Sequence, residues 1–337
     1  MNSLGKIFKV ELFGESHGDS IGVIIDGCPP GLPLSAEDFE ADLARRRSGT
    51  AGTTPRREQD TPSLLSGVFE GHSTGSPICV VFKNTDTRSQ DYGQFAAVPR
   101  PGHADFTSKV KYGGFSDPRG SGHFSGRITT GLVAAGVIAK KILSPAKFVT
   151  AIIAAGGQAD IAGAIAAASN DNDSVGARVE TRVSGLPAGL GEPFFDACES
   201  VIAHAVFAVP AIRGVEFGDG FAASTMRGSV HNDPFIDAKG TTLKNGAGGI
   251  NGGITNGNEI IVRAAVKPTS SIARPQTTFD FKRGLMTELI IEGRHDACIA
   301  LRCAVVIEAA IAIALADLSL IASATAPLNG EKEWRNI

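Results

Sequence analysis

Stretches of apolar residues recur along the chain, and their lengths separate predicted strands from predicted helices. Short stretches predict strands over residues 6–13, 21–25, 67–69, 78–84, 148–155, 176–184, 214–217 and 259–267. Longer stretches, several of them rich in alanine, predict helices over 127–143, 158–172, 194–208 and 304–318. Strands and helices do not alternate one for one, so the order favours an α+β fold over a doubly wound parallel sheet.

Capping and turn residues mark a further helix and three loops. Ser35 is the predicted N-cap of a helix over 35–47, with Asp38 three residues later and an arginine triplet at its end. Residues rich in glycine and polar turn formers predict loops over 48–62, 104–126 and 242–257. The longest of these loops, 104–126, leads directly into the helix predicted over 127–143.

A chain of 337 residues is long enough to bury a large core, and we expect a single domain over 1–337. The halves 1–145 and 146–320 both mix strands and helices, which admits an internal pseudo-repeat, although no self-similarity of sequence supports one.

The sequence predicts a cytoplasmic protein that does not enter a membrane. The most apolar stretch, 304–318, contains Glu308 and Asp317 and is too short to span a bilayer, so we expect a buried core helix. Lys6, Lys9 and Glu11 leave no uncharged signal-peptide core at the N-terminus. We find no lipidation motif.

Composition excludes several classes of function. A net charge of −3 with one Trp and two Tyr argues against nucleic-acid partners, which need basic fields or aromatic stacking platforms. Five cysteines without a C-x-x-C pair argue against a disulfide framework and a structural zinc site. The 41 glycines follow no collagen period, so they indicate many tight turns.

Three histidines lie in glycine-containing, turn-forming segments: 14–18 (GESHG), 100–105 (RPGHAD) and 293–296 (GRHD). Loops on a rigid scaffold are where catalytic groups concentrate, and histidine titrates near neutrality. We therefore expect His17, His103 and His295 to meet in one composite active site. His72, His204 and His231 have no motif around them, and we interpret them as surface or core residues.

Two segments suit anions. The triplet Arg45, Arg46 and Arg47 fits a solvated helix end, but it runs into a polar loop, which favours binding of phosphate or carboxylate slightly more. Residues 120–127 (GSGHFSGR) open a helix, where backbone amides hold phosphate well. Their glycine spacing differs from the dinucleotide fingerprint, so a Rossmann site is not favoured.

Other catalytic classes find little support. No His-containing metal motif and no P-loop occur. Residues 14–18 satisfy G-x-S-x-G, which would make Ser16 the nucleophile of a hydrolase, but no clear helix follows them.

Five ordered motifs resemble those of the chorismate synthase family. They are 13–18 (FGESHG), 88–92 (RSQDY), 100–105 (RPGHAD), 267–271 (KPTSS) and 293–296 (GRHD), and the resemblance runs from about residue 4 to about 318. It implies a β-α-β sandwich fold and the conversion of 5-enolpyruvylshikimate 3-phosphate to chorismate by anti-1,4-elimination of phosphate. It also implies reduced FMN as cofactor and a homotetramer. NADPH enters only as a reductant of the flavin, directly or through a separate flavin reductase, and the sequence leaves that choice open.

The resemblance also implies roles for individual residues. His17 stabilises charge on the reduced flavin, His103 protonates the departing phosphate, and Asp296 acts with flavin N5 on the C6 proton. Substrate binding is implied for Ser16, Arg46, Arg100, Ser125, Arg127 and Arg294. Flavin binding is implied for Arg46, His123, Phe124, Ser125, Pro210, Ala211, Gly252, Lys267, Pro268, Thr269, Ser270, Ser271 and Arg294.

The chain departs from the family pattern at three places. His123 and Phe124 replace an Arg-Ser pair, Ala297 replaces a proline, and residues 48–52 lack an arginine that many relatives have. Arg56 or Arg57 is a candidate substitute for that arginine. The alternatives to an active enzyme of this family are a non-catalytic FMN-binding protein and a hydrolase that uses Ser16.

Overall fold

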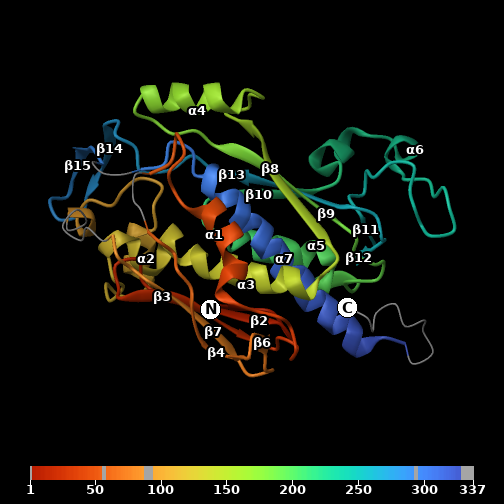
Figure 1. The fold of residues 1–337 in the computed structure, drawn as a ribbon. Helices are drawn as coiled ribbons and strands as arrows, with labels where there is room; N and C mark the ends of the chain where they lie inside the picture. Colours follow the sequence, from red (N-terminus) through yellow and green to blue (C-terminus); the bar gives the residue numbers. More distant parts are fainter. Residues whose placement is uncertain (1, 55–57, 87–93, 292–294, 328–337) are drawn as a thin grey trace.

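Two antiparallel sheets enclose a layer of helices in the computed structural model, which describes residues 2–54, 58–86, 94–291 and 295–327 (Figure 1). The first sheet has the order β1-β2-β3-β7-β4, formed by Ser3–Leu4, Lys9–Gly14, Ser20–Asp26, Ile78–Lys83 and Ser63–Ser66. The second has the order β10-β13-β9-β8, formed by Ile212–Phe217, Ile260–Val266, Ala177–Ser184 and Lys147–Ala155. The α+β class expected from the sequence is confirmed.

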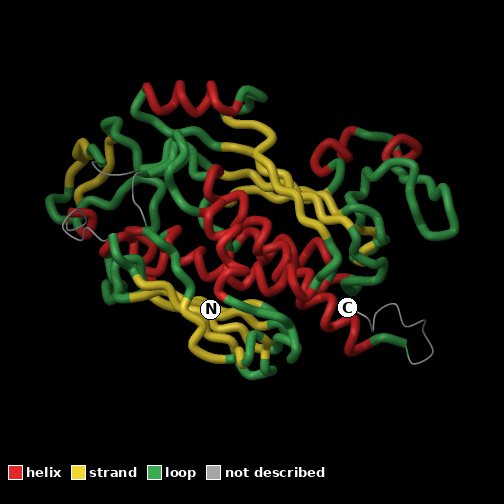
Figure 2. Tube along the Cα trace, in the orientation of Figure 1, coloured by secondary structure: helices red, strands yellow, loops and turns green. Residues whose placement is uncertain are grey.

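The helices between the sheets form the core of this β-α-β sandwich (Figure 2). α3 (Thr129–Ile142) packs against β3 and α7, while α7 (Ala300–Thr325) also packs against β8 and β9. α5 (Cys198–Phe207) lies against α7 and β10, and α1 (Glu40–Arg46) against α3 and α7. Buried side chains from both halves of the chain form one continuous cluster, which includes Ile25, Phe82, Ile138, Val183 and Ile313.

The remaining elements belong to neither of the two large sheets nor to the four helices named above. They are α2 (Asp105–Lys111), α4 (Ile161–Asn170), α6 (Gly228–His231), and the strand pairs β5–β6 (Val68–Phe69, His72–Ser73), β11–β12 (Ile250–Asn251, Ile254–Thr255) and β14–β15 (Gln276–Asp280, Leu285–Leu289). Short 3₁₀ turns are η1 (Ala36–Phe39), η3 (Arg119–Phe124), η4 (Gly126–Ile128), η5 (Phe194–Asp196) and η6 (Gly220–Thr225).

α7 is longer than the sequence indicates. Its 26 residues are long and apolar enough to cross a membrane by length and composition, so the expectation of a helix too short for a bilayer is wrong. The expectation of a core helix is confirmed, because 83% of its most apolar segment is buried inside the protein.

Asp317 in α7 explains why the first predicted strand begins late. Its carboxylate accepts hydrogen bonds from the backbone N–H groups of Lys6, Ile7 and Phe8, at 2.8, 2.7 and 2.9 Å. These amides cannot also join a sheet ladder, so β2 starts at Lys9 and not at residue 6.

Three other predictions need correction. Residues 104–126 are not all loop, because α2 forms there with Asp105 in its first turn and Lys109 and Lys111 in its last. The helix expected over 194–208 is divided, because Phe194 has a φ of +67° and α5 begins only at Cys198. The loop expected over 242–257 contains β11 and β12. By contrast, the N-cap at Ser35 is confirmed: its N–H donates to the Asp38 carboxylate at 2.8 Å.

Candidate active site

The three histidine-bearing loops open onto one cavity of about 780 Å³. His17 follows β2, His103 precedes α2, and His295 precedes α7, so segments far apart in sequence meet at the ends of the central elements. The apolar part of its lining includes Leu12, Leu132, Ile299, Val306 and Ala310. The expectation of one composite site is confirmed for these three histidines.

A tight backbone contact holds His17. Gly120 has a φ of +58°, and a Cβ there would lie 2.5 Å from the imidazole Cδ2 of His17 and 2.9 Å from the hydroxyl of Ser16. The Ser16 N–H donates to the Gly122 carbonyl at 3.1 Å. Ser121 between the two glycines also has a positive φ, of +67°, a strained conformation of the kind found at functional sites.

His103 lies among positive charges. Its Nε2 is 2.7 Å from the hydroxyl oxygen of Ser271. Burial, the Arg100 guanidinium and the Lys267 ammonium lower the pKa of His103 to about 4, against the opposing effect of Asp105. The ring is therefore neutral at pH 7 in the ligand-free protein, and a bound anion would raise its pKa.

Arg100 is held by two kinds of contact. Its Nε and Nη2 donate to the Asp105 carboxylate at 2.8 and 2.7 Å, and Nη2 also donates to the Ser121 hydroxyl at 2.9 Å. The guanidinium lies 4.5 Å from the centroid of the Phe95 ring. Although burial raises the pKa of the Asp105 carboxyl, hydrogen bonds and charge from Arg100 hold it below its usual range.

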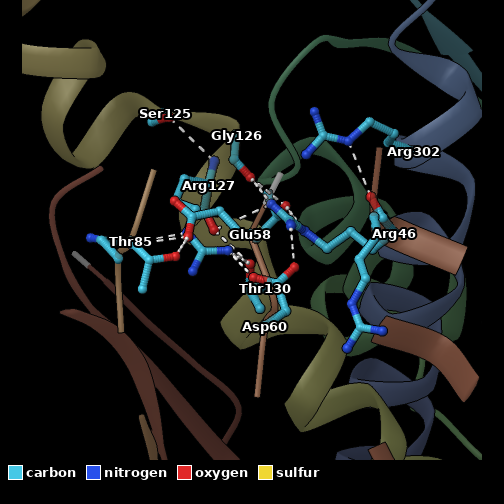
Figure 3. Close-up of polar contacts among 12 residues, drawn as sticks. Arg46, Glu58, Asp60, Thr85, Ser125, Gly126, Arg127, Thr130 and Arg302 are labelled. Atoms are coloured by element: carbon cyan, nitrogen blue, oxygen red, sulfur yellow. Dashed lines mark hydrogen bonds and ion pairs between the residues drawn. The ribbon is translucent and has the colours of Figure 1, made fainter. Parts of the chain in front are cut away.

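Arg46 and Arg127 share the carboxylate of Asp60 (Figure 3). The Arg46 Nη1 lies 3.3 Å from Oδ2, and the Arg127 Nη1 is paired with Oδ1. Arg46 also donates to the Gly126 carbonyl at 2.7 Å. Sequence analysis missed Asp60, because nothing in its spacing connects it with arginines 14 and 67 positions away.

Asp296 is fixed at the start of α7. Its Oδ1 accepts from the Thr54 N–H at 2.8 Å, and its Oδ2 lies 3.3 Å from the Nη1 of Arg302. Arg302 also donates from Nε to the backbone carbonyl of Arg46 at 3.1 Å. Arg302 was not predicted as a site residue, since its sequence surroundings are those of a buried helix, yet it lines the cavity.

Cationic and hydroxyl groups of residues 267–271 also line the cavity. Lys267 donates to the Gly102 carbonyl at 2.7 Å and to the Ser270 hydroxyl at 2.9 Å. The Thr269 hydroxyl oxygen is buried without a hydrogen-bond partner among the described residues. His123 donates from Nδ1 to the Gly14 carbonyl at 2.8 Å, an arrangement that fixes its tautomer.

Most predicted site residues line the cavity, and a few do not. The lining includes His17, Arg46, Arg100, His103, His123, Phe124, Ser125, Arg127, Pro210, Ala211, Lys267, Pro268, Thr269, Ser270, Ser271 and Asp296. Gly252 does not line it, because it lies in the turn between β11 and β12. Arg294, Arg56, Arg57 and the 88–92 motif fall outside the described residues.

Two interpretations of single residues change. Ser16 is fully buried and does not line the cavity, which counts against its implied contact with substrate and also against its use as a nucleophile by a hydrolase. His204, taken from sequence as an ordinary surface or core residue, lines the cavity from α5. His231 is paired with Asp219 at 3.1 Å, on a segment that does not reach the cavity.

Comparison with known proteins agrees with this geometry. A family model described as chorismate synthase matches residues 8–320. The chain belongs to the chorismate synthase family. A chorismate synthase of Chitinophaga pinensis is 57% identical over 322 residues, which cover 95% of this chain and 97% of that protein. A chorismate synthase of Dehalococcoides mccartyi is 45% identical over 351 residues, which cover 95% of this chain and 96% of that protein.

A crystal structure of a chorismate synthase shows the same fold. It superposes with a TM-score of 0.72 and 26% sequence identity, over 94% of this chain and 93% of that chain. The β-α-β sandwich implied by the resemblance is thereby confirmed. The chorismate synthase function is supported over residues 8–320 and not by the local motifs alone.

Proposed function

We propose that the chain converts 5-enolpyruvylshikimate 3-phosphate to chorismate by anti-1,4-elimination, with reduced FMN as cofactor. The observation that carries this proposal is the position of His103 in a cavity lined by Arg46, Arg100, Arg127 and Lys267. The substrate has a phosphate and two carboxylates, and such anions match guanidinium and ammonium groups. Phosphate and the C6 proton leave, so atoms and charge balance without net oxidation.

The residues present fit a flavin mononucleotide. The cavity volume of about 780 Å³ lies in the range of small-molecule sites. Lys267 offers a cation, and the Thr269 hydroxyl, which has no hydrogen-bond partner among the described residues, offers a hydrogen-bonding group. Val306 and Ala310 belong to the apolar lining that would contact the ring system. When bound, reduced FMN supplies electron density transiently to a reaction that is redox-neutral overall.

The chain's own groups have separate tasks. His103 is neutral until an anion binds beside it, and the incoming phosphate then favours its protonated form, which donates a proton to the leaving oxygen. Asp296, held by Thr54 and Arg302, presents a fixed carboxylate for the C6 proton. His17 lies against the backbone of Gly120, and this close approach limits the orientation of its ring.

An anaerobic assay with chemically reduced FMN tests the proposal. Chorismate should form with reduced FMN alone and should not form with oxidised FMN in the verified absence of reductant. Sustained product with oxidised FMN would contradict it. Repeating the oxidised-FMN assay with NADPH, with and without a separate reductase, decides how the flavin is reduced.

We also infer that the chain functions as one domain and assembles as a homotetramer in the cytoplasm. The continuous core supports a single domain. Phe194, Phe195 and Phe221 expose 85%, 94% and 82% of their surface, which is apolar area that a neighbouring subunit would cover. Light scattering that shows a stable monomer at micromolar concentration would contradict the assembly.

A further inference from the structure

We propose that Asp60 is a positioning residue that sets both the geometry and the net charge of the anion site formed by Arg46 and Arg127. The inference rests on the proposed function, because it concerns how that reaction's anionic substrate is received. Asp60 belongs to none of the motifs that identify the family, and it is recognised only from the contacts that its carboxylate makes.

The three side chains form one buried cluster. Their side-chain exposures are 3% for each arginine and 2% for Asp60. Arg46 ends α1 and Arg127 lies in η4, so the carboxylate joins two separate elements beside the cavity that both arginines line. Each carboxylate oxygen is assigned to a different guanidinium, which leaves neither arginine without a counter-ion.

Further hydrogen bonds fix the two guanidinium planes. Arg46 donates from Nε to the Thr129 hydroxyl at 3.2 Å and from Nη2 to the Gly126 carbonyl at 2.7 Å. Arg127 donates from Nε to the Asn84 side-chain oxygen at 2.9 Å. With Asp60 at the centre, the planes have defined orientations before any substrate arrives, which is the condition for electrostatic preorganisation.

The backbone of Asp60 supports a specific placement. Its φ is +52°, in the left-handed region that aspartate and asparagine tolerate better than most other residues. Asparagine is therefore the substitution that preserves both backbone and shape.

The net charge of the cluster leads to the prediction that separates this proposal from a purely structural role for Asp60. The two guanidinium groups and the Asp60 carboxylate sum to a charge of about +1, and removal of the carboxylate would raise that sum to about +2. Glu58, Asp296 and Arg302 also line the cavity, and their charges do not change in the comparison. Asp60 thus weakens the attraction for a bare anion while it fixes the groups that receive the anion. A residue that served only the stability of the fold would not have these opposed effects.

The test uses the full-length protein with saturating FMN, so that the cofactor's own phosphate site is filled, and inorganic phosphate as the probe. In D60N, calorimetry should show phosphate binding that is roughly tenfold tighter than in the unaltered protein. The same variant should lose at least about tenfold in kcat with reduced FMN, because the guanidinium planes lose their common anchor.

Two more variants keep the proposal testable if D60N does not fold. R127Q lowers the cluster's charge by one, so phosphate should bind more weakly than in the unaltered protein. The double variant D60N/R127Q restores the original net charge, and its phosphate affinity should return towards the unaltered value. An affinity for the double variant below that of R127Q overturns the proposal.

D42N is the matched control. Asp42 also contacts two cations, Arg45 and Lys140, but none of the three lines the cavity. D42N should change neither phosphate affinity nor kcat by more than about twofold.

Unchanged or weaker phosphate binding in D60N, an unchanged kcat, or the absence of millimolar phosphate binding to the unaltered protein overturns the inference. Failure of the unaltered protein to form chorismate would count against the proposed function instead, and the phosphate titrations would still decide the role of Asp60.

Discussion

The imidazole Nε2 of His103 lies 2.7 Å from the hydroxyl oxygen of Ser271, which comes from the segment that follows β13. The partnership joins a loop of the first half of the chain to a loop of the second. It also limits the orientations of the ring that is proposed to protonate the leaving phosphate. Ser271 was implied by resemblance as a flavin contact, and its contact with His103 adds a second task.

Ser271→Ala should therefore slow turnover by about tenfold, the effect of losing one hydrogen bond to the proposed general acid. Flavin affinity should change less than turnover, because the lost contact is to His103. Ser271→Thr keeps the hydroxyl and should retain most of the activity. Equal losses in the two variants would indicate a packing effect, and steady-state kinetics with reduced FMN measures both.

His103→Ala should lower the single-turnover rate by roughly 10²–10⁴-fold, as expected for removal of a general acid. The absorbance of bound reduced flavin should stay unchanged. His17→Ala should lower the rate and also shift that absorbance, since its implied partner is the cofactor. The reverse spectroscopic pattern would exchange the two assignments.

The lowered pKa of His103 makes stability depend on pH. The group's ordinary pKa is 6.5 and its pKa in the folded protein is about 4, so between these values the unfolded chain binds more protons than the native one. Stability should then rise with pH across this interval and fall as the pH drops below 6.5. The unfolding free energy should fall by about 1–3 kcal/mol because of His103 as the pH drops from 7 towards 4. Urea unfolding at pH 5 and pH 7 should show a smaller difference for His103→Gln.

Gly120→Ala should lower turnover sharply, because the new methyl group would lie 2.5 Å from the His17 ring. Gly114 is the matched control: it also has a positive φ, of +86°, but a Cβ there meets nothing within 4 Å. Gly114→Ala should show only the backbone cost of about 1 kcal/mol in unfolding, with normal kcat. Equal kcat in the two variants would rule out the contact as the cause.

Asp317→Asn should destabilise the fold by about 2–4 kcal/mol, because a neutral amide cannot serve three backbone donors as a carboxylate does. Thermal unfolding measures the loss. Asp196→Asn removes the partner of Lys6 in an exposed ion pair and should change stability by less than about 0.5 kcal/mol. Comparable losses of stability in both variants would mean that the Asp317 cap stabilises the fold no more than an exposed ion pair does.

The sequence predicts the central elements well and the peripheral ones poorly. β3, β7, α3 and β9 have apolar stretches long enough to specify them, and they lie where expected. α2 and the β14–β15 pair escaped prediction because their residues are mostly polar or exposed and lack a clear period. The length of α7 was underestimated because its ends contain serine, threonine and arginine, which tertiary packing accommodates.

Some residues of the site could be predicted from the sequence and others could not. His17, His103 and Asp296 lie in short motifs that are visible in the sequence. Asp60 and Arg302 act through contacts across long separations, so only the folded chain brings them to the cavity. Local patterns thus find the groups proposed to do chemistry more readily than the groups that hold them in place.

The cap that Asp317 forms over Lys6–Phe8 joins two segments that are about 310 positions apart in the sequence. The loop bearing His17 continues from the strand that follows this cap, so its placement depends on a contact of very high sequence separation. Such contacts form slowly, because the long intervening stretch of chain must first be closed into a loop. We therefore expect formation of the cavity to be a slow step of folding, later than pairing of the neighbouring strands β2 and β3.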